Sequence, residues 1–265
     1  MSVLADKVQP LPIGHLIGGG HRIVTVLGQG GFGITYKAVN NQGHVVAIKE
    51  FCPRACATRV GDGLSASPRD REEFDSGYRY FRDEAETLRK LPPHPNIVAV
   101  HALFRKNGTI YMVMDFIDGE PLNTELVSNA PYSDGAVLDL LGQLTMALGL
   151  LHEHQVLHCD IKPQNIMIDR SDGRPVLIDF GATRDLRRRG APVEILTEGY
   201  APIEMHEREI GRLGPWSDFY SLGVVGYILC TGKKPPSAKI RAETIRSGRP
   251  DPLALCTAER RPGIS

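Results

Sequence analysis

The sequence is poor in cysteine and tryptophan, and it has no net charge. Five cysteines and one tryptophan occur among 265 residues. Such a sparse, odd set is not a disulfide framework, and the closest pair, Cys52 and Cys56, lacks metal-ligand spacing. Lys plus Arg equals Asp plus Glu at 31 each, which argues against a nucleic acid or anionic membrane partner. Any site that binds an anion must therefore be formed by a few nearby residues rather than by the overall charge of the chain.

Long apolar runs are also missing. No stretch approaches the roughly 20 apolar residues that span a bilayer, and the start, Met1-Ser2-Val3, lacks the basic and apolar regions of a signal peptide. We therefore expect a cytoplasmic chain without a membrane segment. With 42% hydrophobic residues, the chain can bury a core as one large domain or two lobes.

The first part of the chain predicts a strand-rich lobe. Pro and Gly in residues 1–20 indicate an irregular lead-in. Residues 52–70 lack periodicity and predict an extended loop or insertion. An apolar stripe at helical spacing, from Phe74 to Leu88, predicts one helix ended by Pro92-Pro93. Apolar patterns predict five strands, at 21–27, 34–39, 44–49, 98–104 and 109–116.

Beyond a linker at 118–121 the pattern becomes helical. The clearest helix spans about 133–153, with Ser133 as a possible N-cap. Another starts near Ser217 and is apolar nearly all round, which predicts burial on every side. Short strands are expected at 166–168 and 176–178. The domains expected are a lead-in at 1–20, an N-lobe at 21–117 and a C-lobe at 118–265.

Gly28-Gln29-Gly30-Gly31-Phe32-Gly33 has the G-x-G-x-x-G spacing that lets backbone N–H groups approach phosphate oxygens. A dinucleotide-binding loop with this spacing must open a helix, whereas residues 34–39 predict a strand. A phosphate-binding loop and a plain Gly-rich turn both remain possible for the motif on its own.

Lys49 closes the third predicted strand and needs an anionic partner to stay charged if it is buried. Glu84 projects from the inner edge of the predicted helix, whereas Glu86 lies about 200° round. Glu84 is therefore the predicted partner, although single Lys and Glu residues are more often solvated surface charges.

The strongest signal is His158-Cys159-Asp160-Ile161-Lys162-Pro163-Gln164-Asn165, followed by Asp179-Phe180-Gly181. Asp160 can accept the proton of an attacking hydroxyl, and Lys162 can offset charge on a transferring phosphoryl group. Asn165 and Asp179 carry the oxygen ligands that Mg²⁺ takes. The alternative is a polar loop of turn-forming residues.

With these motifs in this order, the chain resembles the eukaryotic-like protein kinase family, in a bacterial serine/threonine subgroup. The resemblance covers about Leu11 to Gly232. It implies an α+β bilobal kinase fold, with an antiparallel five-stranded N-lobe carrying one main helix and a mainly helical C-lobe. The activity implied is transfer of the γ-phosphoryl group of Mg-ATP to Ser or Thr hydroxyls of a protein, its own chain included, with Mn²⁺ as an alternative metal.

The family pattern also implies residue roles. Asp160 would be the catalytic aspartate, assisted by Lys162 and Thr197. Lys49, held by Glu84, would bind the α- and β-phosphates. The metal would be held by Asn165 and Asp179. The remaining nucleotide-binding positions implied are Leu27, Gly28, Gly30, Gly33, Thr35, Ala47, the gatekeeper Met114, the backbone groups of Asp115 and Ile117, and Met167.

Two residues depart from the family pattern within the site. Cys159 replaces the arginine that in many relatives binds a phosphorylated activation loop, which predicts activity independent of such phosphorylation. Thr35 replaces the usual valine over the adenine. These departures keep open the alternative of a nucleotide-binding pseudokinase or scaffold without turnover, and a small-molecule phosphotransferase is a third possibility.

The third departure concerns the last part of the chain. The family continues through further helices that carry an arginine for the glutamate of its A-P-E segment, which here resembles Ala201-Pro202-Ile203-Glu204. We therefore expect an incomplete C-lobe in which Glu204 lacks its arginine, unless Arg261 imitates it, and apolar surface is uncovered. Asp218 resembles the aspartate that anchors the family's catalytic loop, and the Arg187-Arg188-Arg189 run is expected to be a solvated loop.

Overall fold

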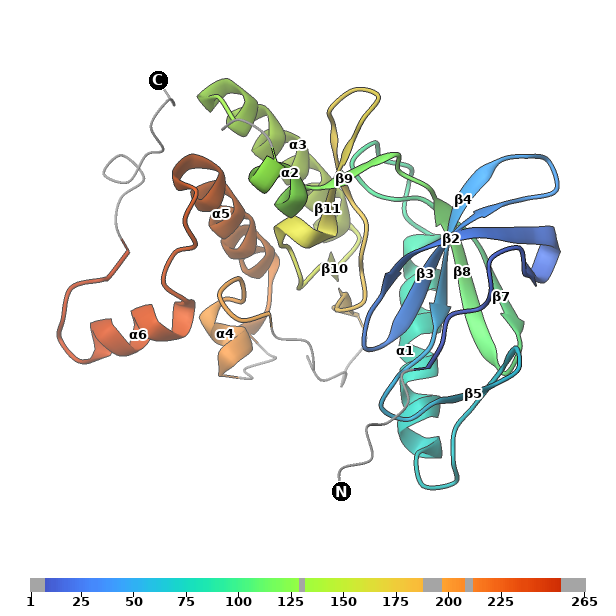
Figure 1. Cartoon of the computed structure of the whole chain (residues 1–265). Helices are drawn as coiled ribbons and strands as arrows, with labels where there is room; N and C mark the ends of the chain where they lie inside the picture. The colour runs from blue at the N-terminus through green and yellow to red at the C-terminus, as the bar shows by residue number, and fades with distance from the viewer. Residues whose placement is uncertain (1–7, 129–131, 188–196, 208–211, 254–265) are drawn as a thin grey trace. The chain divides into compact units, whose positions relative to one another are not determined.

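The computed structural model describes residues 8–128, 132–187, 197–207 and 212–253. The chain forms two compact units. Unit 1 comprises residues 1–92 and 98–117, and unit 2 comprises residues 93–97 and 118–265. The elements of both are labelled in Figure 1.

Unit 1 is built on a six-stranded antiparallel sheet in the order β1-β2-β3-β4-β8-β7. All five predicted strands form, and a sixth, β1, was not predicted because two residues are too short to show alternation. Leu16 and Ile17 of β1 pair with Arg22 and His21. The strands are β1 (Leu16–Ile17), β2 (His21–Gln29), β3 (Gly33–Val39), β4 (Val45–Phe51), β7 (Val100–Lys106) and β8 (Thr109–Asp115).

Helix α1 (Arg71–Leu88) packs against this sheet (Figure 1). Its predicted stripe is confirmed, since Phe74, Phe81, Ala85 and Leu88 are buried and Tyr78 is partly buried. The Phe51 ring at the end of β4 lies 5.3 Å from that of Phe74 and 5.8 Å from that of Phe81. Burial of such aromatic side chains contributes on the order of 1.5–3 kcal/mol each, so this contact fixes the helix on the sheet.

The segment 52–70, predicted as an extended loop or insertion, is not irregular throughout. Strands β5 (Thr58–Val60) and β6 (Gly63–Ser65) form a hairpin there, which three-residue strands do not reveal by periodicity. The hairpin is held by its tertiary contacts: Leu64 is buried, and its N–H donates to the carbonyl of Asn107 at 2.7 Å. Within the lead-in, Val8 and Leu11 are also buried in the core of this unit.

Unit 2 is mainly helical, with α2 (Leu122–Ser128), α3 (Asp134–Glu153), α4 (Ile203–His206), α5 (Pro215–Thr231) and α6 (Ala238–Arg246). The predicted N-cap is confirmed, since Ser133 accepts a hydrogen bond from the Ala136 N–H. Helices α3 and α5 lie side by side (Figure 1). A Cβ atom at Gly226 of α5 would lie 3.0 Å from the Leu141 side chain of α3, so glycine allows the two helices to approach closely.

Burial of α5 is less complete than its composition predicts. Leu222, Val225 and Leu229 are buried, whereas Trp216 and Phe219 are exposed. Helix α3 is long and apolar enough to cross a membrane by length and composition alone, a test that core helices of soluble proteins also pass. Its Leu144, Leu148 and neighbours are buried within unit 2.

Two small sheets complete unit 2. The predicted linker at 118–121 instead contains strand β9 (Gly119–Pro121), which pairs with β11 (Ile166–Asp169), and β11 pairs with β12 (Pro175–Leu177). A side chain at Gly119 would collide with the Ile168 carbonyl, so the pairing depends on this glycine. Strand β10 (Val156–Leu157) pairs with β13 (Arg184–Asp185).

Candidate active site

The glycine motif forms the turn between β2 and β3. A strand follows it, as predicted, and not the helix that a dinucleotide-binding loop needs. The Gly30 N–H donates to the Gly33 carbonyl at 2.9 Å, which closes the turn. A Cβ atom at Gly33 would lie 2.7 Å from the Glu50 carbonyl, so the chain itself requires glycine there. A Cβ atom at Gly28 would meet no atom within 4 Å. The fold therefore leaves space over Gly28 that a phosphate group can use.

Lys49 and Glu84 come together in unit 1, as predicted from the helix phase. The Lys49 Nζ lies 3.4 Å from Glu84 Oε1, and both side chains are largely buried. The Lys49 ammonium also lies 5.7 Å from the centre of the Phe81 ring. In contrast, Glu86 is more exposed and lies 3.9 Å from Arg82 on the helix surface. The reading of Lys49 as an ordinary solvated surface charge is excluded by this burial.

The other predicted nucleotide-binding residues of unit 1 occupy neighbouring positions of the sheet. Thr35 is directly opposite both Gly28 and Lys49, and Ala47 is opposite Met114. Ala47 and Met114 are buried, and Leu27 is exposed. Asp115 and Ile117 follow at the end of β8.

Asp115 makes two contacts of its own in unit 1. Its N–H donates to the Ala99 carbonyl at 3.0 Å, and its carboxylate lies 2.6 Å from His101 Nε2. Because its N–H is already used, the group that Asp115 can offer to an adenine is its carbonyl.

In unit 2, Asp160 is surrounded by three side-chain donors. Its Oδ1 accepts from the Thr197 hydroxyl at 2.6 Å, and its Oδ2 accepts from Lys162 Nζ at 2.7 Å and Asn165 Nδ2 at 2.8 Å. A carboxylate offers about four acceptor positions. Among the described residues, one position therefore remains for an incoming hydroxyl, which a general base needs.

Lys162 joins two of these partners, since its Nζ also lies 3.1 Å from Thr197 Oγ1. The resulting triangle of Asp160, Lys162 and Thr197 confirms that these residues lie together. Thr197 comes 37 positions after Asp160, and only the family resemblance indicated the pairing.

The backbone of this loop is held by Asp218, which is almost completely buried in α5. Its carboxylate accepts from the N–H groups of His158 at 2.9 Å and Cys159 at 2.8 Å. The His152 ring lies 2.8 Å from the same carboxylate, a contact that sequence reasoning missed. Cys159 has a φ of 62°, an unusual value for a residue with a side chain. The buried carboxylate stabilises this conformation because it pairs both N–H groups at once.

The Cys159 side chain lies in an apolar cluster with Leu157, Ala201, Met205 and Leu213. Burial raises the pKa of its thiol well above the ordinary value, so the thiol stays protonated. At the position where the family pattern described above has an arginine, this chain thus has an uncharged group that packs against Ala201, Met205 and Leu213.

His158 is fully buried beside the Phe180 ring, at 4.7 Å between ring centres. Burial lowers the pKa of His158, and the carboxylates of Asp218, Asp160 and Asp179 oppose that shift. The neutral ring accepts from the Asp160 N–H through Nδ1 at 3.3 Å. His158 therefore supports the loop as an uncharged acceptor.

Asn165 and Asp179 are brought together by a backbone hydrogen bond, in which the Ile178 N–H donates to the Asn165 carbonyl at 3.1 Å. The Asn165 amide nitrogen donates to both the carbonyl and the carboxylate of Asp160. This orientation leaves the amide oxygen as the group that can face a cation. Amide and carboxylate oxygens are hard ligands, so the pair fits a divalent metal completed by phosphate oxygens and water. Met167 lies in β11, two residues beyond Asn165, and is partly buried.

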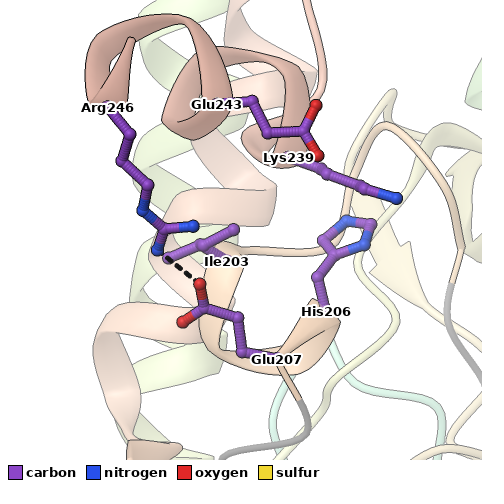
Figure 2. Close-up of a pocket in the computed structure, with 6 residues that line it drawn as sticks. All are labelled: Ile203, His206, Glu207, Lys239, Glu243 and Arg246. Carbon is purple, nitrogen blue, oxygen red and sulfur yellow. Dashed lines mark hydrogen bonds and ion pairs between the residues drawn. The ribbon is translucent and has the colours of Figure 1, made fainter.

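Glu204 was expected to lack an arginine partner unless Arg261 supplies one, and Arg261 lies outside the described residues. Arg188 and Arg189 of the expected solvated loop also lie outside them. Glu204 Oε1 accepts a hydrogen bond from the Ser217 hydroxyl at 2.6 Å, which links residue 204 to the start of α5. A pocket of about 170 Å³ lies nearby between α4 and α6 (Figure 2). Its lining includes His206, Lys239 and an ion pair of Glu207 with Arg246, and it contains none of the predicted site residues.

Comparison with known proteins agrees with this geometry. The protein kinase domain family matches residues 21–257, and the chain belongs to this family. The serine/threonine-protein kinase PknA of Nostoc sp. is 33% identical over 230 residues, which are 83% of this chain and 38% of that protein. PknA of Mycobacterium tuberculosis is 33% identical over 233 residues, covering 84% and 49% of the two chains.

A solved structure described as the PpkA-294 apo form superposes with a TM-score of 0.81 at 31% identity, covering 97% of this chain and 89% of that one. The predicted bilobal kinase fold and the bacterial serine/threonine kinase family are thereby confirmed. The family uses ATP and a divalent metal. The chain spans less than half the length of these two curated relatives.

Proposed function

We propose that this chain transfers the γ-phosphoryl group of ATP to Ser or Thr hydroxyls of protein substrates, with its own chain as one candidate substrate. The observation that carries this proposal is the Asp160 carboxylate, which is oriented by Lys162, Asn165 and Thr197 and keeps an acceptor position for a hydroxyl. The names of the relatives support Ser/Thr specificity, since both are serine/threonine-protein kinases.

In the proposed reaction Asp160 orients the attacking hydroxyl and takes up its proton as the new oxygen–phosphorus bond forms. The bond between the γ-phosphorus and the β–γ bridging oxygen breaks in the same displacement, and ADP leaves with that oxygen. Lys162 is close enough to Asp160 to counter negative charge that develops on the transferring group. Lys49, fixed by Glu84, binds phosphate oxygens. Asn165 and Asp179 would hold Mg²⁺, or Mn²⁺ in its place, and the metal would neutralise phosphate charge. Since ATP is supplied in the cytoplasm, we infer that the chain acts there.

Gly28, Gly30 and Gly33 would cover the phosphates, and Leu27, Thr35, Ala47, Met114 and Met167 would contact the nucleoside. Asp115 would offer its carbonyl to the adenine, and Ile117 its N–H. Thr35 places a hydroxyl where an apolar side chain is usual, which we expect to weaken nucleotide binding modestly rather than to prevent it.

Transfer of labelled γ-phosphate to the chain itself or to a generic protein acceptor tests the proposal. We expect transfer by the native chain, none above background by Asp160→Asn, and a loss of at least about 100-fold for Lys49→Met. Binding of ATP without any transfer by the native chain would contradict the proposal and favour a nucleotide-binding scaffold. Transfer to a small molecule and to no protein would favour the third class of function.

A further inference from the structure

Glu50 follows Lys49 on β4, and its carboxylate lies on the opposite face of the sheet. It is completely buried. The hydroxyls of Tyr36 and Tyr111 donate to it at 2.8 and 2.7 Å, and Arg59 Nη2 donates at 2.6 Å. A buried carboxylate is costly unless it is paired and hydrogen-bonded. These three partners satisfy it, and none of them belongs to the proposed catalytic machinery.

This network reaches the N-terminal segment Val8–Leu11, which we call the strap. The Leu11 N–H donates to the Tyr36 hydroxyl at 3.0 Å, and Arg59 Nε donates to the Gln9 carbonyl at 2.8 Å. The strap is therefore attached at two points to groups that Glu50 orients. Burial and the Glu50 charge raise the pKa of the Tyr36 hydroxyl, so this group stays protonated and can donate to Glu50.

The strap in turn holds one side of the glycine-rich turn. Gln29, between Gly28 and Gly30, donates from its side-chain amide to the Val8 carbonyl at 2.6 Å. The other side is held by the chain that follows Glu50, where the Cys52 N–H donates to the Phe32 carbonyl at 2.9 Å. The Arg54 N–H donates to the Gly31 carbonyl at 2.8 Å. A loop of glycines loses more conformational freedom on ordering than any other sequence.

We propose that Glu50 and Arg59 are positioning residues that hold the glycine-rich turn through the strap, and that the strap thereby sets the affinity of this chain for ATP. A turn that is already ordered loses less entropy when a nucleotide binds. This inference rests on the proposed function for its ATP-binding part, whereas the restraint of the turn itself does not depend on that function.

The test uses Gln29→Ala, which removes only the link from turn to strap, and Arg59→Met, which removes one of the two attachments of the strap to the Glu50 network. Gln42→Ala and Arg79→Met are matched controls, because both side chains are exposed. Hydrogen exchange of the backbone amides at residues 28–33 is measured without nucleotide, so that its outcome is independent of catalysis. The KM for ATP and kcat are then measured on the same proteins.

We expect amide exchange in the turn to accelerate about tenfold in Gln29→Ala and less in Arg59→Met, which leaves the attachment of Leu11 to Tyr36 in place, with little change in the controls. The KM for ATP should rise several-fold in both variants while kcat changes less.

Arg59→Met leaves the Glu50 charge buried without its cation, so the thermal unfolding of this variant is measured as well. If Arg59→Met does not fold, the result for Gln29→Ala decides whether the inference holds. Unchanged exchange at residues 28–33 in a folded Gln29→Ala would overturn the inference, even if the chain is an active kinase. If Gln29→Ala exchanges faster but the native chain binds no ATP, the strap still restrains the turn, and the inference about ATP affinity is rejected.

Discussion

Lys162 Nζ lies 3.1 Å from Thr197 Oγ1, although 35 positions separate these residues. Through this contact the segment that begins at residue 197 is tied to the loop that carries the proposed base. The Thr197 hydroxyl thus both accepts from Lys162 and donates to Asp160.

Replacement of Thr197 by valine should therefore lower activity. The variant keeps the shape of the side chain but loses the donor to Asp160, and a hydrogen bond to a charged group is worth about 1.5–3 kcal/mol. We expect kcat to fall roughly 10- to 100-fold. Thr197→Ser retains the hydroxyl and should keep most of the activity, and equal losses in both variants would contradict this role.

Replacement of Asp179 by asparagine should raise the metal requirement. Asp179 is the only carboxylate of the proposed ligand pair, so its neutralisation removes the charge that attracts the cation. We expect a chelator to abolish transfer by the native chain and added Mg²⁺ to restore it. In Asp179→Asn the Mg²⁺ concentration for half-maximal activity should rise at least tenfold. Asp172→Asn, at an exposed turn, is the matched control.

Asp218→Asn should destabilise unit 2. The amide has one acceptor oxygen in place of two charged ones, and it must serve the N–H groups of His158 and Cys159 from a buried position. We expect the free energy of unfolding to fall by roughly 2–4 kcal/mol in denaturant titrations. Asp118→Asn, whose carboxylate is exposed beside Arg170, should lose less than about 1 kcal/mol. Similar losses in the two variants would show that Asp218 does not support the loop.

The stability of the chain should fall between neutral and mildly acidic pH, in part because of His158. Its pKa is lowered in the folded state, so below about pH 6.5 the unfolded chain binds a proton that the folded chain does not. The stability contribution is complete above the unfolded pKa and is lost as pH falls toward the folded one, at up to about 1.4 kcal/mol per pH unit.

Unfolding free energies of the native chain and His158→Asn, compared from pH 7.5 to 5.0, measure this effect. The variant cannot titrate at this position and should show the shallower slope. His94, whose pKa is also lowered by burial, contributes equally to both proteins. Parallel slopes would mean that His158 does not contribute to the pH dependence.

Phosphatase treatment should leave the activity of the native chain unchanged. Cys159 cannot bind a phosphate as arginine does, and its thiol is buried among Ala201, Met205 and Leu213. Packing, which needs no modification, holds these three residues against the Cys159 side chain. The measurement is γ-phosphate transfer before and after treatment, with an independent phosphoprotein as the control for the phosphatase. Loss of turnover after dephosphorylation would contradict the prediction.

The sequence by itself determined the five main strands of unit 1, the long helices and the identity of the clustered site residues. Local periodicity carries the information on strands and helices, because it records which side chains face the core. The site residues were indicated by the spacing of the motifs and by the resemblance to the kinase family. Helix phase alone distinguishes Glu84 from Glu86, since 3.6 residues per turn place only one of them on the buried face.

Only the tertiary structure decided the contacts that join distant segments. The hairpin at 58–65 and the strap have no periodic pattern, and they form because they cover the buried Glu50 network. Lys49 and Glu50 are neighbours in the sequence, but their side chains lie on opposite faces of the sheet. Lys49 pairs with Glu84 of α1, whereas Glu50 is bound by Arg59 on the other face. Likewise, the pairing of Asp218 with the N–H groups of His158 and Cys159 spans about 60 positions. Such contacts arise from the packing of whole elements, and a local pattern of residues does not encode them.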